Sequence, residues 1–199
     1  MARSIARDHD EKRMGLLASA AKVFATEGFE RASMARIAAE AGISKANIYH
    51  YYDSKHALLY DILDTYLTEL RDRVIGLDLS GLDPEAQLRA VVTETLLAYQ
   101  GMDHKHQIQS SGIPMLAPEQ QESLRGIQRE LVEQMSGILQ ALAPEALVDR
   151  AALRAATMSV YGMLNWFYMW NGRAGAEARR AYAQVVCDMV LGGVRGIRP

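Results

Sequence analysis

Residues 33–55 read SMARIAAEAGISKANIYHYYDSK. Ser33 and Ser44 each precede a short run of helix-forming residues, and a serine in that position caps a helix N-terminus with its hydroxyl oxygen. Between the two runs lies the tight turn Ala41-Gly42-Ile43-Ser44, in which glycine relieves the steric penalty of a positive φ. Two short helices joined by a turn that contains glycine indicate a helix-turn-helix, whose second helix enters the major groove of DNA.

The second helix of this motif, from Ser44 to about Tyr51, has two chemically different faces. At 100° per residue, Ile48 and Tyr52 share one side and are expected to face the core. The other side has no carboxylate and carries amide, imidazole and phenol groups, which can bond base edges or phosphate oxygens. Lys45 lies at the N-terminal tip, where a recognition helix meets the bases. The alternative is a solvated polar face on a packed three-helix unit.

Composition and charge fit a globular protein without a strong preference for nucleic acid. The chain has 199 residues, 49% of them hydrophobic, and a net charge of -2. Residues 1–55 hold nine Lys and Arg against seven Asp and Glu, whereas residues 56–199 hold thirteen against seventeen. The N-terminal part is therefore the one expected to face an anion.

Three features predict a cytoplasmic protein. Cys187 is the only cysteine, so no disulfide can form within the chain. The first thirteen residues contain no apolar run of the kind that forms a secretory signal. The longest apolar stretch, Met158–Trp170, is shorter than the roughly 20 residues that span a bilayer.

Apolar residues recur at helical spacing along the whole chain, and no alternating strand pattern is present. We therefore expect an all-α fold of about nine helices. Their expected bounds are a helix ending at Gly28, helices capped by Ser33, by Ser44 and by Asp53 or Ser54, a helix beginning at Pro84, a short helix with irregular flanks within Gly101–Pro118, and helices over Pro118–Leu142, Glu145–Asn171 and Ala176–Val194.

Several segments together resemble the N-terminal domain of TetR-family regulators. They are Phe24–Phe29, Ser33–Ala38, Ala41–Lys45, Ile48–Tyr52 and Ser54–Leu59. The resemblance implies a helix-turn-helix DNA-binding domain over residues 1–55 and a ligand-binding and dimerisation domain over residues 56–199.

The same resemblance implies a set of DNA contacts and a double-stranded operator as partner. The contacts are Ser33, Ser44, Lys45, Ala46, Asn47, Tyr49, His50, Tyr51 and Lys55. Asn47 departs from the family, which often has threonine or a small residue there, so the operator sequence stays open. Arg3 and Arg7 form either an arm for the minor groove or a basic tail.

One recognition helix reads only a few base pairs, so specific binding requires a two-fold dimer that presents two helices about 34–36 Å apart. In the family the last two long helices form this interface. The final helix here carries an apolar stripe that suits such a contact, although the stripe could instead pack within the subunit. The stripe consists of Tyr182, Val185, Val186, Met189 and Val190.

The aromatic-rich segment Met158–Trp170 is the candidate wall of an effector site, because aromatic side chains with a few polar groups suit a small-molecule cavity. The alternative is that these side chains belong to the core and the dimer interface. The candidate ligand-binding residues are His104, Lys105, Tyr161, Asn165, Trp166, Tyr168 and Arg173. The pair His104-x-His106 lacks a third metal ligand nearby, so we expect no metal and no cofactor.

The C-terminal part also resembles TetR-type regulators of acyl-CoA and phenylacetate catabolism. The resemblance rests on His104–Gln107, Pro118–Gln121 and Leu164–Trp170, whereas the subgroup's Trp-Tyr-Arg-Pro appears only as Trp170-Asn171-Gly172-Arg173. It implies a repressor released from DNA by a CoA thioester such as phenylacetyl-CoA. A lipophilic drug-like effector and a helical adaptor that binds protein are the alternatives, and no motif of an enzyme is present.

Overall fold

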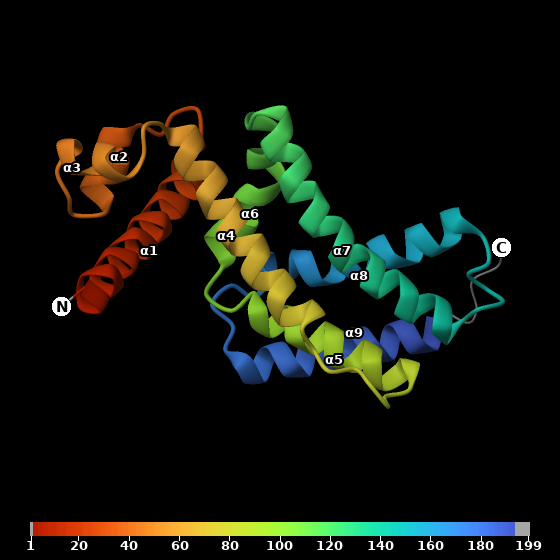
Figure 1. The fold of residues 1–199 in the computed structure, drawn as a ribbon. Helices are drawn as coiled ribbons and strands as arrows, with labels where there is room; N and C mark the ends of the chain where they lie inside the picture. The colour runs from red at the N-terminus through yellow and green to blue at the C-terminus, as the bar shows by residue number, and fades with distance from the viewer. Residues whose placement is uncertain (1, 194–199) are drawn as a thin grey trace. The chain divides into compact units, whose positions relative to one another are not determined.

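The computed structural model describes the backbone of residues 2–193 and the side chains of residues 10–193. Over this part of the chain the protein is all-α, as predicted, with no strand (Figure 1). The elements are α1 (Ala2–Glu27), α2 (Met34–Glu40), α3 (Lys45–Tyr51), α4 (Lys55–Ile75), α5 (Pro84–Ala98), α6 (Asp103–Gly112), the 3₁₀ turn η1 (Ile113–Met115), α7 (Pro118–Leu142), α8 (Arg150–Trp170) and α9 (Ala176–Gly193). None of the helices in the described part is both long and apolar enough to cross a membrane.

The chain divides into two compact units. Unit 1 extends to Tyr66 and also includes His104–Leu124, and unit 2 comprises Leu67–Asp103 and the chain from Arg125 onward. The helices α4 and α7 each contribute residues to both units. The functional boundary between residues 55 and 56 stays a prediction.

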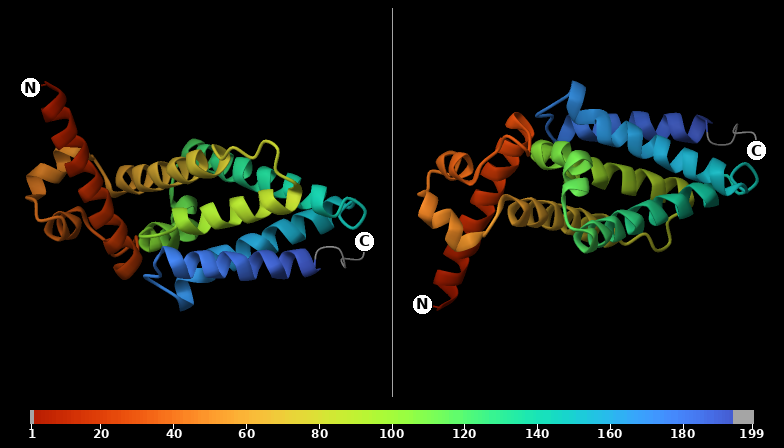
Figure 2. Two further views of the ribbon diagram at one scale, coloured as in Figure 1. Left: turned by 90° about the horizontal axis from the view of Figure 1, so that it is seen from below. Right: turned by 90° about the horizontal axis from the view of Figure 1, so that it is seen from above.

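In unit 1, α2 packs against α1 and against α3 (Figure 2). Ile37 of α2 and Ile48 of α3 are fully buried there. The Ser33 hydroxyl oxygen accepts from the Arg36 amide at 3.2 Å, and the Ser44 hydroxyl oxygen accepts from the Asn47 amide at 3.1 Å. Both predicted caps are thus confirmed, and they fix where α2 and α3 begin.

Glycine ends two of these helices through the left-handed conformation that the sequence predicts. Gly28, directly after α1, has φ 85°, and Gly42, between α2 and α3, has φ 68°. The α4 cap is Ser54 rather than Asp53, since the Ser54 hydroxyl oxygen accepts from the Ala57 amide at 3.1 Å. Arg3 and Arg7 fall within α1, but their side chains lie outside the described residues, so the arm stays a prediction.

In unit 2, α5 packs along α9, and apolar side chains of both helices are fully buried. Arg179 of α9 is also buried, and its guanidinium donates to the carbonyl oxygens of Ala174 and Leu96 at 3.0 and 3.1 Å. These bonds compensate much of the desolvation cost of burying the guanidinium cation.

The predicted start of α8 at Glu145 is wrong. The helix begins at Arg150, because the Asp149 carboxylate caps it by accepting from the Ala152 amide at 2.9 Å. The preceding segment forms a separate turn that buries Leu147 completely. A strong cap and a buried leucine together outweigh the helical periodicity of this segment.

Candidate nucleic-acid interface

The helix α3 presents the polar face that the sequence predicts. Ile48 is fully buried, whereas Tyr49 is 45% exposed. The exposed members of the predicted contact set on α3 and at the two caps are Ser33, Ser44, Lys45, Ala46, Asn47, Tyr49 and His50. Tyr51 is half-buried. The exposed amide, imidazole, phenol and ammonium groups can all form hydrogen bonds to bases or phosphates.

Lys55, predicted to meet a phosphate, already has protein partners. Its ammonium donates to the carbonyl oxygens of Phe29 and Glu30 at 2.9 and 3.1 Å, and it lies 4.5 Å from the centre of the Phe29 ring. Lys55 therefore ties the segment between α1 and α2 to the start of α4. A phosphate contact by Lys55 stays a prediction, and it would compete with these bonds.

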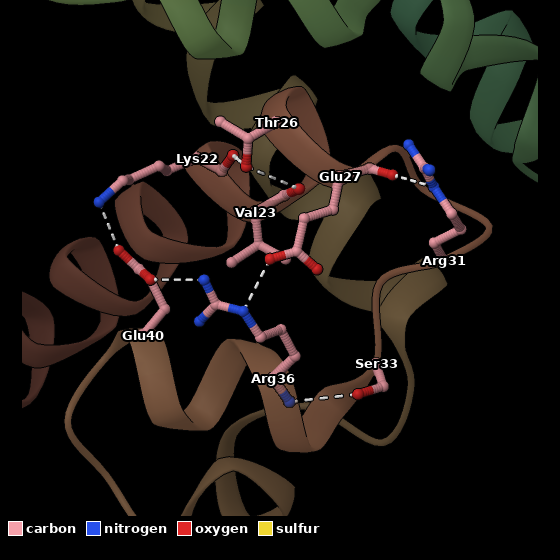
Figure 3. A network of polar contacts seen from close by, with 8 residues as sticks. All are labelled: Lys22, Val23, Thr26, Glu27, Arg31, Ser33, Arg36 and Glu40. Carbon is pink, nitrogen blue, oxygen red and sulfur yellow. Dashed lines mark hydrogen bonds and ion pairs between the residues drawn. The ribbon is translucent and has the colours of Figure 1, made fainter.

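A network of ion pairs joins α1 to α2 (Figure 3). Glu40 pairs with Lys22 at 2.5 Å and with Arg36 at 3.0 Å, while Arg36 also pairs with Glu27 at 2.7 Å. Hydrogen bonds from Lys22 and Arg36 lower the pKa of the Glu40 carboxyl. The spacing of Arg36 and Glu40 could have indicated the pair within α2, but nothing local indicated the partners on α1.

A second polar cluster joins α1, α3 and α4 through one carboxylate. Asp61 of α4 accepts from the Arg13 Nε atom at 3.0 Å and from a second nitrogen of the same guanidinium. The Tyr52 hydroxyl, at the C-terminus of α3, donates to the same carboxylate, and the Thr65 hydroxyl donates to it at 3.3 Å. Burial and the neighbouring Asp61 raise the pKa of Tyr52, so its hydroxyl stays a donor. This Asp61 cluster fixes the C-terminus of α3 to α1 and α4.

The structure divides the predicted effector residues between the two units. His104 and Lys105 belong to unit 1, where His104 is exposed and Lys105 is only 8% exposed. The other predicted residues belong to unit 2, and they are Tyr161, Asn165, Trp166, Tyr168 and Arg173. Their role in binding stays a prediction.

Within unit 2 these side chains point in different directions. The buried Tyr161 donates to the Leu131 carbonyl at 2.9 Å, and the Asn165 amide oxygen accepts from the Tyr99 hydroxyl at 2.8 Å. Trp166 is 61% exposed, Arg173 is exposed and Tyr168 is half-buried. Helical periodicity groups residues by face, but it does not reveal which face meets the core.

No group of three His, Cys, Asp or Glu side chains that could hold a metal ion exists among the described residues. His106, the second histidine of the His-x-His pair, shares a hydrogen bond of 2.7 Å between its Nδ1 atom and the Tyr66 hydroxyl. This histidine therefore links α6 to α4 within unit 1.

Two family models match the chain. Residues 16–62 match the bacterial regulatory proteins of the tetR family, and residues 81–194 match the tetracyclin repressor-like C-terminal domain. The chain is similar to the transcriptional repressor KstR2 of Rhodococcus jostii, 36% identical over 95 residues, which cover 48% of this chain and 45% of KstR2. It is also 35% identical over 83 residues to the transcriptional activator FasR of Mycolicibacterium smegmatis, across 42% of this chain and 38% of FasR. The chain thus spans less than half the length of these two curated relatives.

Solved structures extend the similarity to the whole fold. A TetR-family transcriptional regulator from Bordetella parapertussis superposes with a TM-score of 0.84 and 29% identity, covering 91% of this chain and 94% of that one. The ketosteroid regulator KstR2 of Mycobacterium tuberculosis gives a TM-score of 0.79 at 20% identity, covering 91% and 93% of the two chains. Together with the two family models, these similarities confirm the resemblance seen in the helix-turn-helix: the chain belongs to the TetR family of bacterial regulators.

Proposed function

We propose that this chain is a homodimeric transcriptional repressor that binds operator DNA through α3 and is released by a small acyl-CoA effector. The observation that carries DNA binding is the arrangement of α3. Ile48 anchors the helix in the core, while Lys45, Asn47 and His50 face outward. Such a face is suited to direct readout in a major groove.

Fluorescence anisotropy with a labelled duplex tests this function. The duplex is the DNA upstream of the chain's own gene, and a scrambled duplex of equal length and composition is the control. Specific operators are typically bound about 10³-fold or more tightly than other sequences at physiological salt. Equal affinity for the two duplexes, or no binding to either, would favour the adaptor alternative.

Exposed apolar residues on α8 and α9 support the dimer. Trp166, Met169 and Trp170 of α8 are 61%, 54% and 58% exposed, and Val185 and Met189 of α9 are 51% and 63% exposed. Large exposed apolar side chains gathered on neighbouring helices are typical of a protein interface.

The predicted stripe on α9 is partly buried within the subunit and partly exposed. Val186 is fully buried, Val190 is 9% exposed, and Tyr182 stacks on Phe167 with ring centres 4.6 Å apart. Val186 and Val190 pack within the subunit, so the prediction that the whole stripe faces a partner is wrong. Val185 and Met189 remain available to a second copy, and Tyr182 is half-buried.

Replacing Trp166 and Met189 together by lysine is expected to raise the dimer dissociation constant about 100-fold. Each charge would be buried in an apolar contact, and about 1.4 kcal/mol per substitution corresponds to a factor of ten in affinity. Sedimentation velocity over a concentration series measures the constant. Val148, 73% exposed between α7 and α8, supplies the control V148K, which should leave the dimer unchanged. A dimer that survives the double substitution would place the interface elsewhere.

Lys105 supports an anionic effector. Only 8% of the residue is exposed, and its side chain has no ion-pair or hydrogen-bond partner among the described residues, so its ammonium reaches solvent. An ammonium at the accessible end of a buried stem can pair with the anion of a ligand. An acyl-CoA supplies acceptor oxygens, and the structural neighbour AibR, 22% identical, was solved with isovaleryl coenzyme A and operator DNA.

A thermal-shift series identifies the effector class. Phenylacetyl-CoA, other acyl-CoA esters, free phenylacetate and a lipophilic cation are compared, because a true ligand stabilises the folded state by mass action. K105M is expected to weaken acyl-CoA binding about 10- to 100-fold, since hydrogen bonds to charged groups contribute about 1.5–3 kcal/mol. Stabilisation by the cation alone, with no response to any thioester, would favour the drug-like alternative while leaving DNA binding intact.

A further inference from the structure

A groove that none of the predicted effector residues lines runs between α7 and α8 in unit 2. Its volume is about 590 Å³, within the range of small-molecule sites. The helices meet beside it, where the Ser136 and Thr157 hydroxyls are 2.9 Å apart, and Figure 1 shows α7 and α8 crossing. The lining residues are Arg125, Gln128, Arg129, Val132, Glu133, Ser136, Arg150, Leu153, Arg154 and Met158.

The groove concentrates positive charge. Two arginines come from α7 and two from α8, and Glu133 is the only carboxylate in the lining. On each helix the arginines are four residues apart, Arg125 with Arg129 and Arg150 with Arg154, a spacing at which like charges destabilise the helix. Two such pairs face one groove, and a bound anion would reduce the repulsion within each pair.

Most of these guanidinium groups are available to a ligand. Arg125, Arg150 and Arg154 have no ion pair or hydrogen bond from their side chains to another described residue. By contrast, Arg73, Arg89 and Arg179 of unit 2 are held by carboxylates. The three groove arginines therefore keep their planar donor forks free, and such forks bind phosphate oxygens in pairs.

The groove is not uniformly polar. Val132 of α7 and Leu153 and Met158 of α8 form an apolar strip among the arginines, with Gln128 and Ser136 as neutral hydrogen-bonding groups. Inorganic phosphate would leave this strip in water. An organic molecule that carries phosphates could cover the strip and place its anionic end among the guanidinium groups.

We infer that this groove binds a small organic diphosphate, with two or more phosphate charges on the arginines and the organic part on the apolar strip. Two sources share this chemistry, a free nucleotide and the nucleotide end of a CoA ester. The inference concerns ligand binding by unit 2 and does not depend on operator binding.

Isothermal titration of the full-length chain with ADP tests the site. The wild type is expected to bind ADP at least tenfold more tightly than AMP, and adenosine not measurably. R150Q/R154Q and, separately, R125Q/R129Q are each expected to weaken ADP binding at least tenfold. R71Q/R73Q removes the same charge from α4 of unit 2 outside the groove and should change ADP binding less than twofold.

Competition by coenzyme A separates the two sources. If the groove holds the nucleotide end of the effector, coenzyme A is expected to displace ADP, and the displacement should increase with the concentration of coenzyme A. If ADP binding is unaltered by coenzyme A, the groove is a separate nucleotide site.

Circular dichroism and thermal melts confirm that the variants fold. The inference is overturned if ADP does not bind, if adenosine binds as well as ADP, or if both groove variants retain wild-type affinity. A groove variant that alters the dimer constant and leaves ADP binding unchanged would also overturn it.

Discussion

The double variant K45A/N47A is expected to lose operator affinity by a factor of about 30 to 3 × 10⁴. Each good contact between a side chain and a base edge contributes about 1–3 kcal/mol, and both side chains lie on the exposed face of α3. The fold should persist, because Ile48 and the Ser44 cap, which hold α3, are untouched. Fluorescence anisotropy of the specific duplex at several salt concentrations measures the loss.

The salt dependence separates the two contributions. If the Lys45 ammonium meets a phosphate, K45A alone should reduce the slope of log affinity against log salt by about one. N47A should leave that slope unchanged and instead relax the preference for the specific sequence. A matched control is R73A/Q100A, which removes one cation and one amide from unit 2, where Arg73 is held only by an exposed pair with Glu94. Wild-type affinity in K45A/N47A would remove α3 from the interface.

Lys55 is a poor choice for the same purpose. Its ammonium bonds to the Phe29 and Glu30 carbonyls, so K55A would loosen the segment between α1 and α2 as well as remove a charge. A loss of affinity in K55A would therefore not show a phosphate contact. The conservative Y49F is more informative, because it removes only a hydroxyl from a side chain that is 45% exposed.

The sequence predicts the helix-turn-helix well because its signals are local. Ser33, Ser44, Gly28 and Gly42 each act within a few residues of their own position, and the apolar spacing around Ile48 separates the inner face of α3 from the outer one. Local steric and capping preferences determine these features, and they can be read before any tertiary contact is known.

The features that the sequence did not predict depend on distant partners. Arg13 and Asp61 are 48 residues apart, and no spacing rule connects an arginine of α1 with a carboxylate of α4. The aromatic segment of α8 presents the same difficulty, because Tyr161 is buried whereas Trp166 faces outward. Periodicity places both on a helix, but only the packed neighbours decide which side becomes core.

The variant D61N is expected to lower the free energy of unfolding by about 1–3 kcal/mol, the cost of leaving charged hydrogen-bonding groups unsatisfied. Arg13 would lose its carboxylate partner, and Tyr52 would lose a charged acceptor. The value lies below the larger cost of breaking a fully buried pair, because the Arg13 and Asp61 side chains are 35% and 20% exposed. Urea denaturation measures the loss. D64N on the same helix is the control, since Asp64 takes no part in this cluster.

The same variant should weaken operator binding, although Asp61 lies on α4 and is not among the predicted DNA contacts. With a neutral amide in place of the Asp61 carboxylate, the bond from Tyr52 weakens. The recognition helix then samples more orientations that do not fit the groove, and affinity falls in proportion to the fraction of chains that stay competent. Because no phosphate contact is lost, the salt slope should remain that of the wild type. Y52F, which removes one hydroxyl, should show a smaller loss of the same kind. A reduced salt slope in D61N, or behaviour identical to D64N, would mean that the Asp61 cluster does not position α3.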